Sequence, residues 1–355
     1  MRLTIIGTGL IGTSIAMAAS QLDDVEVTGW DPDSGELSLA AQRSGLAPAP
    51  SLEAAVKDAD AVVVAAPVGR ISSVVKAVLD ASPADALITD VGSTKQGVVE
   101  ANSDPRFVGG HPLAGGETGG AAHARADLFK GATWFLTPVE NTAGVQLERA
   151  FRIVTELGAR PRAVAPDVHD RILATVSHLP HVLANLLVAE AAATLADEGE
   201  PLPATGPSFR DATRVAGAPS SIWTDIYLSN ADALIERLDA VELGIKRVRE
   251  LLVARDSAGV TEWNDLAAAQ RGQLAAEGAT GGSVHELRVQ VPNEPGVLAS
   301  IALTLGGVGI DLTDLQLHPA ADRATGTIVL GIEGADSAER AAKLISELGH
   351  SVSQG

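Results

Sequence analysis

The chain has 355 residues, of which 45 are acidic and 26 basic, giving a formal net charge of −19, and it contains no cysteine. At roughly 100–200 residues per domain, this length suggests two or three domains. Nucleic-acid binding needs a basic face, so the charge argues against that partner. Without cysteine there are no disulfides, thiolate nucleophiles or thiolate metal sites, which fits a cytoplasmic protein. An anionic substrate would have to be held by a few arginines and helix N-termini against the overall field.

Two apolar segments imitate membrane or export signals. The first follows Arg2, but glycines at positions 7, 9 and 12 interrupt it, unlike a signal peptide. The second, residues 182–196, contains Asn185 and Glu190. It is also shorter than the ~20 residues that a spanning helix needs. We therefore expect no membrane segment.

Residues 1–165 alternate short apolar runs with helical stretches, the runs being 3–6, 25–28, 61–65, 86–89 and 107–108. Buried parallel strands are short continuous apolar runs of this kind. Strands that alternate with helices form a doubly wound sheet. We therefore predict an α/β domain of Rossmann type over residues 1–165.

The rest of the chain changes character twice. Residues 166–277 have no strand pattern and three helical patterns, 168–195, 222–255 and 262–277, which predict an all-helical domain. Its Ala-rich helices pack either within one chain or across a dimer, and we favour a homodimer. Residues 278–283 have the composition of a flexible linker. Residues 284–355 follow the order βαββαβ, which predicts a small α+β domain of ferredoxin-like plan.

The first strand runs into a glycine motif, Gly7-Thr8-Gly9-Leu10-Ile11-Gly12, which opens a helix. Gly7 allows a tight turn, Gly9 lets the backbone approach a pyrophosphate, and Gly12 lets helix and strand pack closely. The helix N-terminus then faces the phosphates. Asp31 ends the second strand, where an acid accepts the ribose hydroxyls and repels a 2′-phosphate, so we predict NAD rather than NADP. The alternative is a glycine-rich turn without a ligand.

Three further strand ends carry candidate site residues. Pro67 follows the 61–65 run and either borders the ligand crevice or simply ends the strand. Ser93 follows the 86–89 run, and His111 follows the 107–108 run. Histidine is suited to take a proton near neutral pH, and oxidation of a hydroxyl needs such a group. We predict that Ser93 and His111 meet beside the nicotinamide; a structural or solvated histidine is the alternative.

The long helical pattern from 168 carries a polar stripe. Asp170, Ser177 and His181 stand at i, i+7 and i+11 and share one helix face. Such a stripe is either a cleft wall or a buried network, and we favour the cleft. Pro180 is expected to kink the helix. His178 lies about 80° off that face and is expected to be structural.

Two later features suit carboxylates. Arg214 follows a proline-rich segment and opens a helical region, and its planar fork suits a carboxylate. The alternative is a salt bridge to Asp211 or another acid. In the C-terminal part, the loop 292–298 links a strand to a helix whose free N–H groups suit a carboxylate, and Gly296 permits close backbone approach. The alternative is a dimerisation module without a ligand.

Four motifs in order resemble those of the prephenate dehydrogenase family. They are Asp90-Val91-Gly92-Ser93-Thr94-Lys95, Gly110-His111-Pro112-Leu113-Ala114-Gly115-Gly116-Glu117, Ser177-His178-Leu179-Pro180-His181, and Phe209-Arg210-Asp211-Ala212-Thr213-Arg214 with Trp223 beyond. The resemblance covers residues 1 to about 277, and the tail resembles an ACT domain. It implies oxidative decarboxylation of prephenate to 4-hydroxyphenylpyruvate with NAD, in tyrosine biosynthesis, and no metal.

The resemblance also implies residue roles. His111 accepts the ring hydroxyl proton or hydrogen-bonds to it, Ser93 orients that imidazole, and Arg214 binds a substrate carboxylate. The remaining substrate contacts implied are His181, Glu117 and Trp223, and the polar stripe adds Asp170 as a further substrate contact. The ACT resemblance implies an amino-acid effector, tyrosine first and phenylalanine second, held by Asn293, Gly296 and Leu298.

Three alternative functions stay open. An arogenate dehydrogenase would need an acid beside the substrate ammonium, and Glu117 and Asp170 are the candidates. A β-hydroxyacid dehydrogenase generally uses a lysine on the long helix, but there is none between Lys130 and Lys246. A non-catalytic sensor of NAD and amino acids would not need Ser93, His111 and Arg214 together. We favour prephenate as the substrate.

Overall fold

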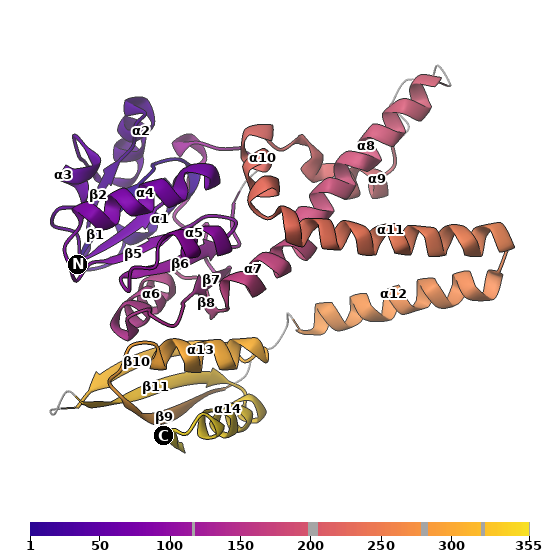
Figure 1. The fold of residues 1–355 in the computed structure, drawn as a ribbon. Coiled ribbons are helices and arrows are strands. Elements are labelled where there is room, and N and C mark those ends of the chain that lie inside the picture. The colour runs from indigo at the N-terminus through magenta and orange to yellow at the C-terminus, as the bar shows by residue number, and fades with distance from the viewer. Residues whose placement is uncertain (116–117, 198–204, 278–282, 321–323, 355) are drawn as a thin grey trace.

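The computed structural model describes residues 1–115, 118–197, 205–277, 283–320 and 324–354. It has three parts in chain order: a large α/β part, a helical arm and a small α+β part (Figure 1). The small part lies against α6 and β8 of the α/β part, and the arm extends away from the sheet.

The α/β part is built on one eight-stranded sheet with the order β3-β2-β1-β4-β5-β6-β7-β8. All neighbouring strands run parallel except β6 and β7, which are antiparallel. The five predicted strands are confirmed, and three more are present. The strands are β1 (Arg2–Ile6), β2 (Glu26–Trp30), β3 (Ala47–Pro48), β4 (Ala61–Val64), β5 (Leu87–Asp90), β6 (Phe107–Pro112), β7 (Thr133–Thr137) and β8 (Arg160–Ala163).

Helices cover both faces of this sheet, which explains its continuous apolar strands. Ile5 and Val63 pack into the cluster on the face of α1 and α6, whereas Ile6 and Val64 pack on the face of α3 and α4. Side chains alternate between the two faces, so a strand buried on both faces has no alternating solvent-facing positions and is mostly apolar. The helices are α1 (Leu10–Ala19), α2 (Ser34–Ser44), α3 (Leu52–Val56), α4 (Val68–Ala81), α5 (Gln96–Ala101), the 3₁₀ turn η1 (Ala121–His123) and α6 (Gly144–Glu156).

The helical arm differs from its predicted pattern at two breaks. A π-helical turn, η2 (Ala174–His178), separates the first pair of helices, since Pro180 lacks the N–H that would continue the regular ladder. A second break at Asn230 divides the predicted helix 222–255. The elements are α7 (Pro166–Leu173), η2, α8 (Leu179–Asp197), α9 (Pro207–Thr213), the 3₁₀ turn η4 (Arg214–Gly217), α10 (Ser220–Ser229), α11 (Ala231–Ala254) and α12 (Ser257–Glu277).

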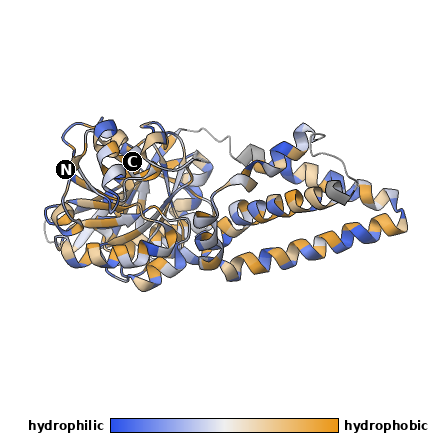
Figure 2. Cartoon of the chain, turned by 90° about the horizontal axis from the view of Figure 1, so that it is seen from above, coloured by the Kyte–Doolittle hydropathy of each residue, from blue (hydrophilic) through white to orange (hydrophobic). Residues whose placement is uncertain are grey.

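The helices α8, α11 and α12 of the arm carry many hydrophobic residues, whose ribbon is orange in Figure 2, and many of their side chains are exposed. They include Leu186, Leu187, Ile235, Leu243, Leu252, Leu266 and Leu274. Single chains rarely leave so much apolar surface in water, so a partner is expected to cover it.

One helical run, Pro166–Thr194, is long and apolar enough to cross a membrane by length and composition, and 28% of its apolar window is buried. The apolar segment 182–196 noted in the sequence is the later part of this run, because the helix begins at Pro166. The same run carries the buried polar side chains of Asp170 and His178, which belong to the site below.

The C-terminal part confirms the predicted βαββαβ order. Its antiparallel sheet has the order β10-β11-β9-β12. Leu287, Val289 and Val291 alternate on the buried face of β9. The elements are β9 (Val284–Pro292), α13 (Val297–Gly307), β10 (Leu312–Pro319), β11 (Thr325–Glu333), α14 (Ala335–Glu347) and β12 (Ser351–Gln354). Of the predicted linker 278–283, residues 278–282 lie outside the described residues.

Two glycines, Gly296 just before α13 and Gly306 within it, dock this part onto the large sheet. A Cβ at Gly296, whose φ is +84°, would lie 2.2 Å from the carbonyl oxygen of Glu140, and one at Gly306 would lie 2.0 Å from that of Ala163. Only glycine allows such backbone contact. Asp311 adds an ion pair with Arg162 of β8 at 3.0 Å. The two parts therefore share one apolar core.

Candidate active site

The glycine motif lies where the strand order reverses, between β1 and β4, as expected for a dinucleotide site. A Cβ at Gly7 (φ +94°) would lie 2.4 Å from the carbonyl oxygen of Ala65, and one at Gly12 would lie 1.9 Å from that of Gly7. A Cβ at Gly9, in contrast, would meet nothing within 4 Å. The fold therefore requires Gly7 and Gly12. Gly9 instead leaves open space through which a ligand can approach the protein backbone.

The polar groups around this loop fit a dinucleotide. Asp31 follows β2, and its carboxylate accepts hydrogen bonds from the N–H of Thr8 at 2.6 Å and of Asp33 at 2.8 Å. Gly9 caps α1 without a side-chain hydrogen bond, so the N–H groups of the first turn, beginning at Leu10 and Ile11, remain for an anion. The predicted placement of the glycine motif and Asp31 therefore fits NAD.

Pro67 lies after β4 and opens α4. Its carbonyl oxygen accepts hydrogen bonds from the N–H of Arg70 at 2.9 Å and of Ile71 at 3.1 Å. These bonds show its structural role at the helix start, and a contact with the cofactor stays a prediction.

A buried ion pair joins the ends of β5 and β6. Lys95 bonds to Asp90, and both side chains are fully buried. The Asp90 carboxylate also accepts from the N–H of Gly92 and of Gly110, and the Lys95 ammonium donates to the carbonyl oxygen of Gly110 at 2.9 Å. The pair thus holds the Ser93 loop and the residue before His111 in one arrangement.

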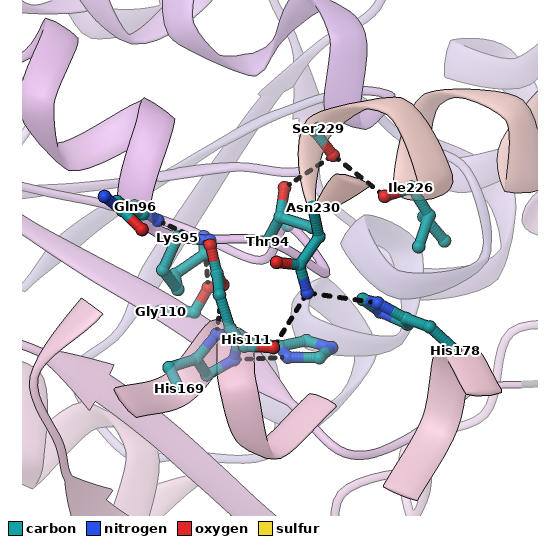
Figure 3. Close-up of polar contacts among 12 residues, drawn as sticks. Thr94, Lys95, Gln96, Gly110, His111, His169, His178, Ile226, Ser229 and Asn230 are labelled. Atoms are coloured by element: carbon teal, nitrogen blue, oxygen red, sulfur yellow. Dashed lines mark hydrogen bonds and ion pairs between the residues drawn. The ribbon is translucent and has the colours of Figure 1, made fainter. Parts of the chain in front are cut away.

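His111 lies at the end of β6 and is the first member of a buried hydrogen-bonded chain (Figure 3). Its Nδ1 lies 2.9 Å from Nε2 of His169, whose Nδ1 lies 2.7 Å from Oδ1 of Asp170. The Asp170 carboxylate also accepts from the backbone N–H of Lys95 at 2.8 Å and of Gln96 at 2.9 Å.

This series of hydrogen bonds from His111 to Asp170 corrects two expectations. We expected Ser93 to orient the imidazole, but Nδ1 of His111 faces His169, and the described residues show no hydrogen bond between Ser93 and His111. We also expected Asp170 to contact the substrate, but it is 3% exposed and its oxygens are committed to His169 and two backbone N–H groups. The polar stripe is therefore a buried network at Asp170.

Burial sets the charge of both imidazoles. It lowers the pKa of His111 well below its usual value, and the nearby His169 and Lys95 lower it further. Burial also lowers the pKa of His169, although the hydrogen bond to Asp170 opposes that shift. Both rings are therefore neutral near neutral pH, as a general base must be.

His178 is structural, as predicted, and joins the same buried network through Asn230. Its Nδ1 lies 3.2 Å from Nδ2 of Asn230, which also donates to the carbonyl oxygen of Asp170 at 2.7 Å (Figure 3). Burial lowers the pKa of His178 to about 4.

A cluster of ring side chains, His181, Trp223 and Tyr227, lies on α8 and α10. The ring of His181 stacks on Trp223 with centroids 3.6 Å apart and planes 6° from parallel. Its Nδ1 also hydrogen-bonds to the hydroxyl of Tyr227 and lies 3.3 Å from Nδ2 of Asn185. The structure therefore brings the predicted His181 and Trp223 into direct contact.

Arg214 opens the turn η4 and is exposed. Its neighbour Val215 offers a backbone group that raises the pKa of His181 against the larger lowering by burial. Arg214 is thus adjacent in sequence to a residue that touches the aromatic group. Glu117 lies outside the described residues. Among the described residues, no group of three or more metal-ligating side chains is present.

Four side chains of this site were missed by sequence reasoning: Lys95, His169, Tyr227 and Asn230. Lys95 ends the motif that begins at Asp90, and His169 precedes Asp170, so both were within reach of the motif argument. Tyr227 and Asn230 gave no local signal, because their partners are 46 and 60 residues away.

The sequence of this chain is similar to those of known proteins over most of its length. The family model described as the prephenate dehydrogenase nucleotide-binding domain matches residues 17–162, and that of the prephenate dehydrogenase dimerization domain matches residues 165–265. A prephenate dehydrogenase of Bacillus subtilis is 31% identical over 352 residues, covering 96% of this chain and 94% of that protein. A cyclohexadienyl dehydrogenase of Zymomonas mobilis is 34% identical over 261 residues, covering 72% and 89%.

A solved structure agrees with these sequence matches. Prephenate dehydrogenase from Aquifex aeolicus, in complex with hydroxyphenyl propionate and NAD+, superposes with a TM-score of 0.73 at 26% identity, covering 77% of this chain and 98% of that one. The chain therefore belongs to the prephenate dehydrogenase family.

Proposed function

We propose that this chain is an NAD-dependent prephenate dehydrogenase, which converts prephenate to 4-hydroxyphenylpyruvate and carbon dioxide in tyrosine biosynthesis. The observation that carries this function is the buried, neutral His111 at the end of β6, on the sheet edge that also bears the glycine motif. The 31% identity with the Bacillus subtilis enzyme along nearly the whole chain supports it.

The reaction requires the protein to accept one proton and later return it. Bound NAD supplies the acceptor for the hydride that leaves the ring carbinol carbon. Nε2 of His111 takes the hydroxyl proton as that carbon becomes a carbonyl. Loss of the ring carboxylate as carbon dioxide then leaves a phenolate oxygen, which takes the proton back from His111. Hydride, carbon dioxide and proton are thus all accounted for within one turnover.

The substrate contacts are proposed from the family motifs. Arg214 binds a substrate carboxylate through its planar fork. The stacked pair of His181 and Trp223 forms an aromatic wall, and Glu117 and Ser93 border the pocket. The aromatic contacts around His181 support this assignment, because they hold two of these side chains together.

Arogenate is the second candidate substrate. The hydrogen bonds of Asp170 remove it as an ammonium partner, which leaves Glu117. The 34% identity with a cyclohexadienyl dehydrogenase supports arogenate as a candidate substrate. Steady-state assays with NAD, following absorbance of the reduced nicotinamide, compare the two substrates. We expect the higher kcat/KM with prephenate; a higher value with arogenate would reassign the substrate, and no reduction with either would refute the function.

We infer that the C-terminal part is a ferredoxin-like regulatory (ACT) domain with an amino-acid effector, tyrosine first and phenylalanine second. Its docking changes the expected effector contacts, because Gly296 lies against Glu140, and Leu298 is 3% exposed. Asn293 remains a candidate from the loop. A cavity of about 820 Å³ borders the same loop at Pro295 and reaches Glu140 and Gln96, so it offers room for the effector.

Inhibition assays test this regulatory role. We expect tyrosine, rather than phenylalanine, to lower the rate of prephenate oxidation, and a Glu140→Gln variant to change the tyrosine concentration that halves the rate. Equal rates with and without either amino acid would refute it.

We infer a cytoplasmic homodimer assembled through the arm. The exposed leucines and isoleucines of α8, α11 and α12 support this, as does the match of residues 165–265 to a dimerization domain. Light scattering during gel filtration is expected to give twice the mass of one chain. A monomer at micromolar concentration would contradict the dimer.

A further inference from the structure

We propose that His169 and Asp170 are positioning residues that fix the tautomer of His111, so that its Nε2 carries the lone pair that accepts the substrate proton. The inference rests on the proposed function of His111 as the base. It assigns roles to two side chains that do not touch the substrate.

The Asp170 carboxylate has two backbone N–H donors. Its Oδ1 accepts from the N–H of Lys95 and its Oδ2 from that of Gln96, at 2.8 and 2.9 Å. A backbone N–H only donates, so both carboxylate oxygens must act as acceptors there. A carboxylate that accepts at both oxygens suits these two donors and also a ring N–H of His169. The ionised carboxylate is the form that suits all its partners.

The tautomer of His169 follows from this. An ionised carboxylate only accepts, so the 2.7 Å contact requires the proton of His169 on Nδ1. Burial keeps His169 neutral, so its Nε2 has a lone pair and no proton. The contact at 2.9 Å with His111 is therefore a hydrogen bond in which Nδ1–H of His111 donates. The lone pair of His111 is left on Nε2.

The same series of hydrogen bonds stabilises the imidazolium form of His111 after it takes the proton. The imidazolium would keep Nδ1–H donating to His169, with the Asp170 carboxylate at the far end of the chain to offset the charge. That offset matters because the other charged or titratable groups include Lys95 and His178, which both oppose protonation of His111. Asp90, which is paired with Lys95, limits the effect of the ammonium.

A replacement of one atom tests the chain. In Asp170→Asn, the amide oxygen can still accept a hydrogen bond from one backbone N–H, while the NH₂ group donates to Nδ1 of His169. His169 would then carry its proton on Nε2 and donate to His111, whose proton would move to Nε2. We expect kcat to fall on the order of 10²–10⁴-fold, as expected when a catalytic imidazole is held in the wrong tautomer. The Kd of NAD should stay within about twofold.

The control is Asp167→Asn on the same helix. Asp167 is exposed and pairs with Arg171, outside the chain to His111, so its kcat should match the wild type. A second variant, His169→Phe, keeps the ring shape beside Phe135 but removes both nitrogens, and it should also lose turnover. It keeps the idea testable if Asp170→Asn fails to fold, as judged by circular dichroism and NAD binding.

Nitrogen NMR of the full-length protein labelled with ¹⁵N-histidine reads the tautomer without substrate. The His111 signals are assigned by their loss in His111→Asn. We expect a protonated Nδ1 and an unprotonated Nε2 in the wild type, and the reverse in Asp170→Asn. A wild-type His111 with its proton on Nε2, or an Asp170→Asn variant with unchanged shifts and unchanged kcat, would overturn the proposal. Failure of prephenate oxidation alone would refute the proposed function and leave this NMR result to stand.

Discussion

Nδ1 of His111 and Nε2 of His169 lie 2.9 Å apart, although 58 residues separate them in the chain. The contact joins the end of a sheet strand to the first helix of the arm. The site is therefore formed only when the sheet and the arm fold together, and the position of the imidazole depends on both.

Asp31 is predicted to set the cofactor preference. In Asp31→Ala, the loss of a carboxylate that receives the ribose hydroxyls should lower kcat/KM for NAD about 10–100-fold, as expected for a hydrogen bond to a charged group. The value for NADP should fall less or rise, because a repelling charge is gone. The exposed Asp23→Ala is the control. An unchanged ratio of the two cofactors would remove Asp31 from this role.

Arg214 is predicted to act in substrate binding. In Arg214→Lys, the fork that grips a carboxylate by two bonds becomes a single point charge. We expect the KM for prephenate to rise about tenfold or more with kcat nearly unchanged. Arg237→Lys, whose half-buried side chain on α11 pairs with Glu236, should leave both constants at wild-type values. A normal KM in Arg214→Lys would place the carboxylate elsewhere.

His178 is predicted to make the fold sensitive to acid. Above pH 6.5 the folded and unfolded states both hold it neutral. Below that, the unfolded chain binds a proton that the folded site resists until about pH 4, so stability falls as the pH falls through this window. The effect is on the order of 3 kcal/mol, at about 1.4 kcal/mol per pKa unit.

Chemical denaturation near neutral pH and near pH 4.5 measures this effect. In His178→Gln the free energy of unfolding should fall less on acidification than in the wild type, because one titrating group is gone. An equal fall in both proteins would show that burial of His178 does not contribute.

Gly306 is predicted to dock the C-terminal part. In Gly306→Ala the new Cβ would lie 2.0 Å from the carbonyl oxygen of Ala163, so α13 must move away from β8. We expect a lower Tm. Gly307→Ala is a matched control, since a Cβ there meets nothing within 4 Å. Equal melting of the two variants would show that the contact is not formed in solution.

The sequence predicted the central sheet well, because its strands are buried on both faces and read as continuous apolar runs. It missed β8, whose sequence from Arg160 to Ala163 contains two arginines and a proline. Neither residue type marks a buried strand, and β8 is an edge strand that gains its cover from α13.

Gly7, Asp31 and His111 lie at the strand ends where the sequence predicted them, because each belongs to a motif directly at the end of a strand. Prediction failed where the role depends on a distant partner. Asp170 was assigned to substrate because no local pattern shows that the N–H groups of Lys95 and Gln96 occupy it. His178 was correctly expected to be structural, but its partner Asn230 is 52 residues away and left no local pattern.

The most direct test of the account is His111→Asn, assayed with NAD and prephenate beside the wild type. We expect wild-type affinity for NAD, measured by titration, together with a loss of kcat on the order of 10²–10⁴-fold, because the variant lacks the group that takes the hydroxyl proton. Turnover near the wild-type value in a variant that binds NAD normally would contradict the account.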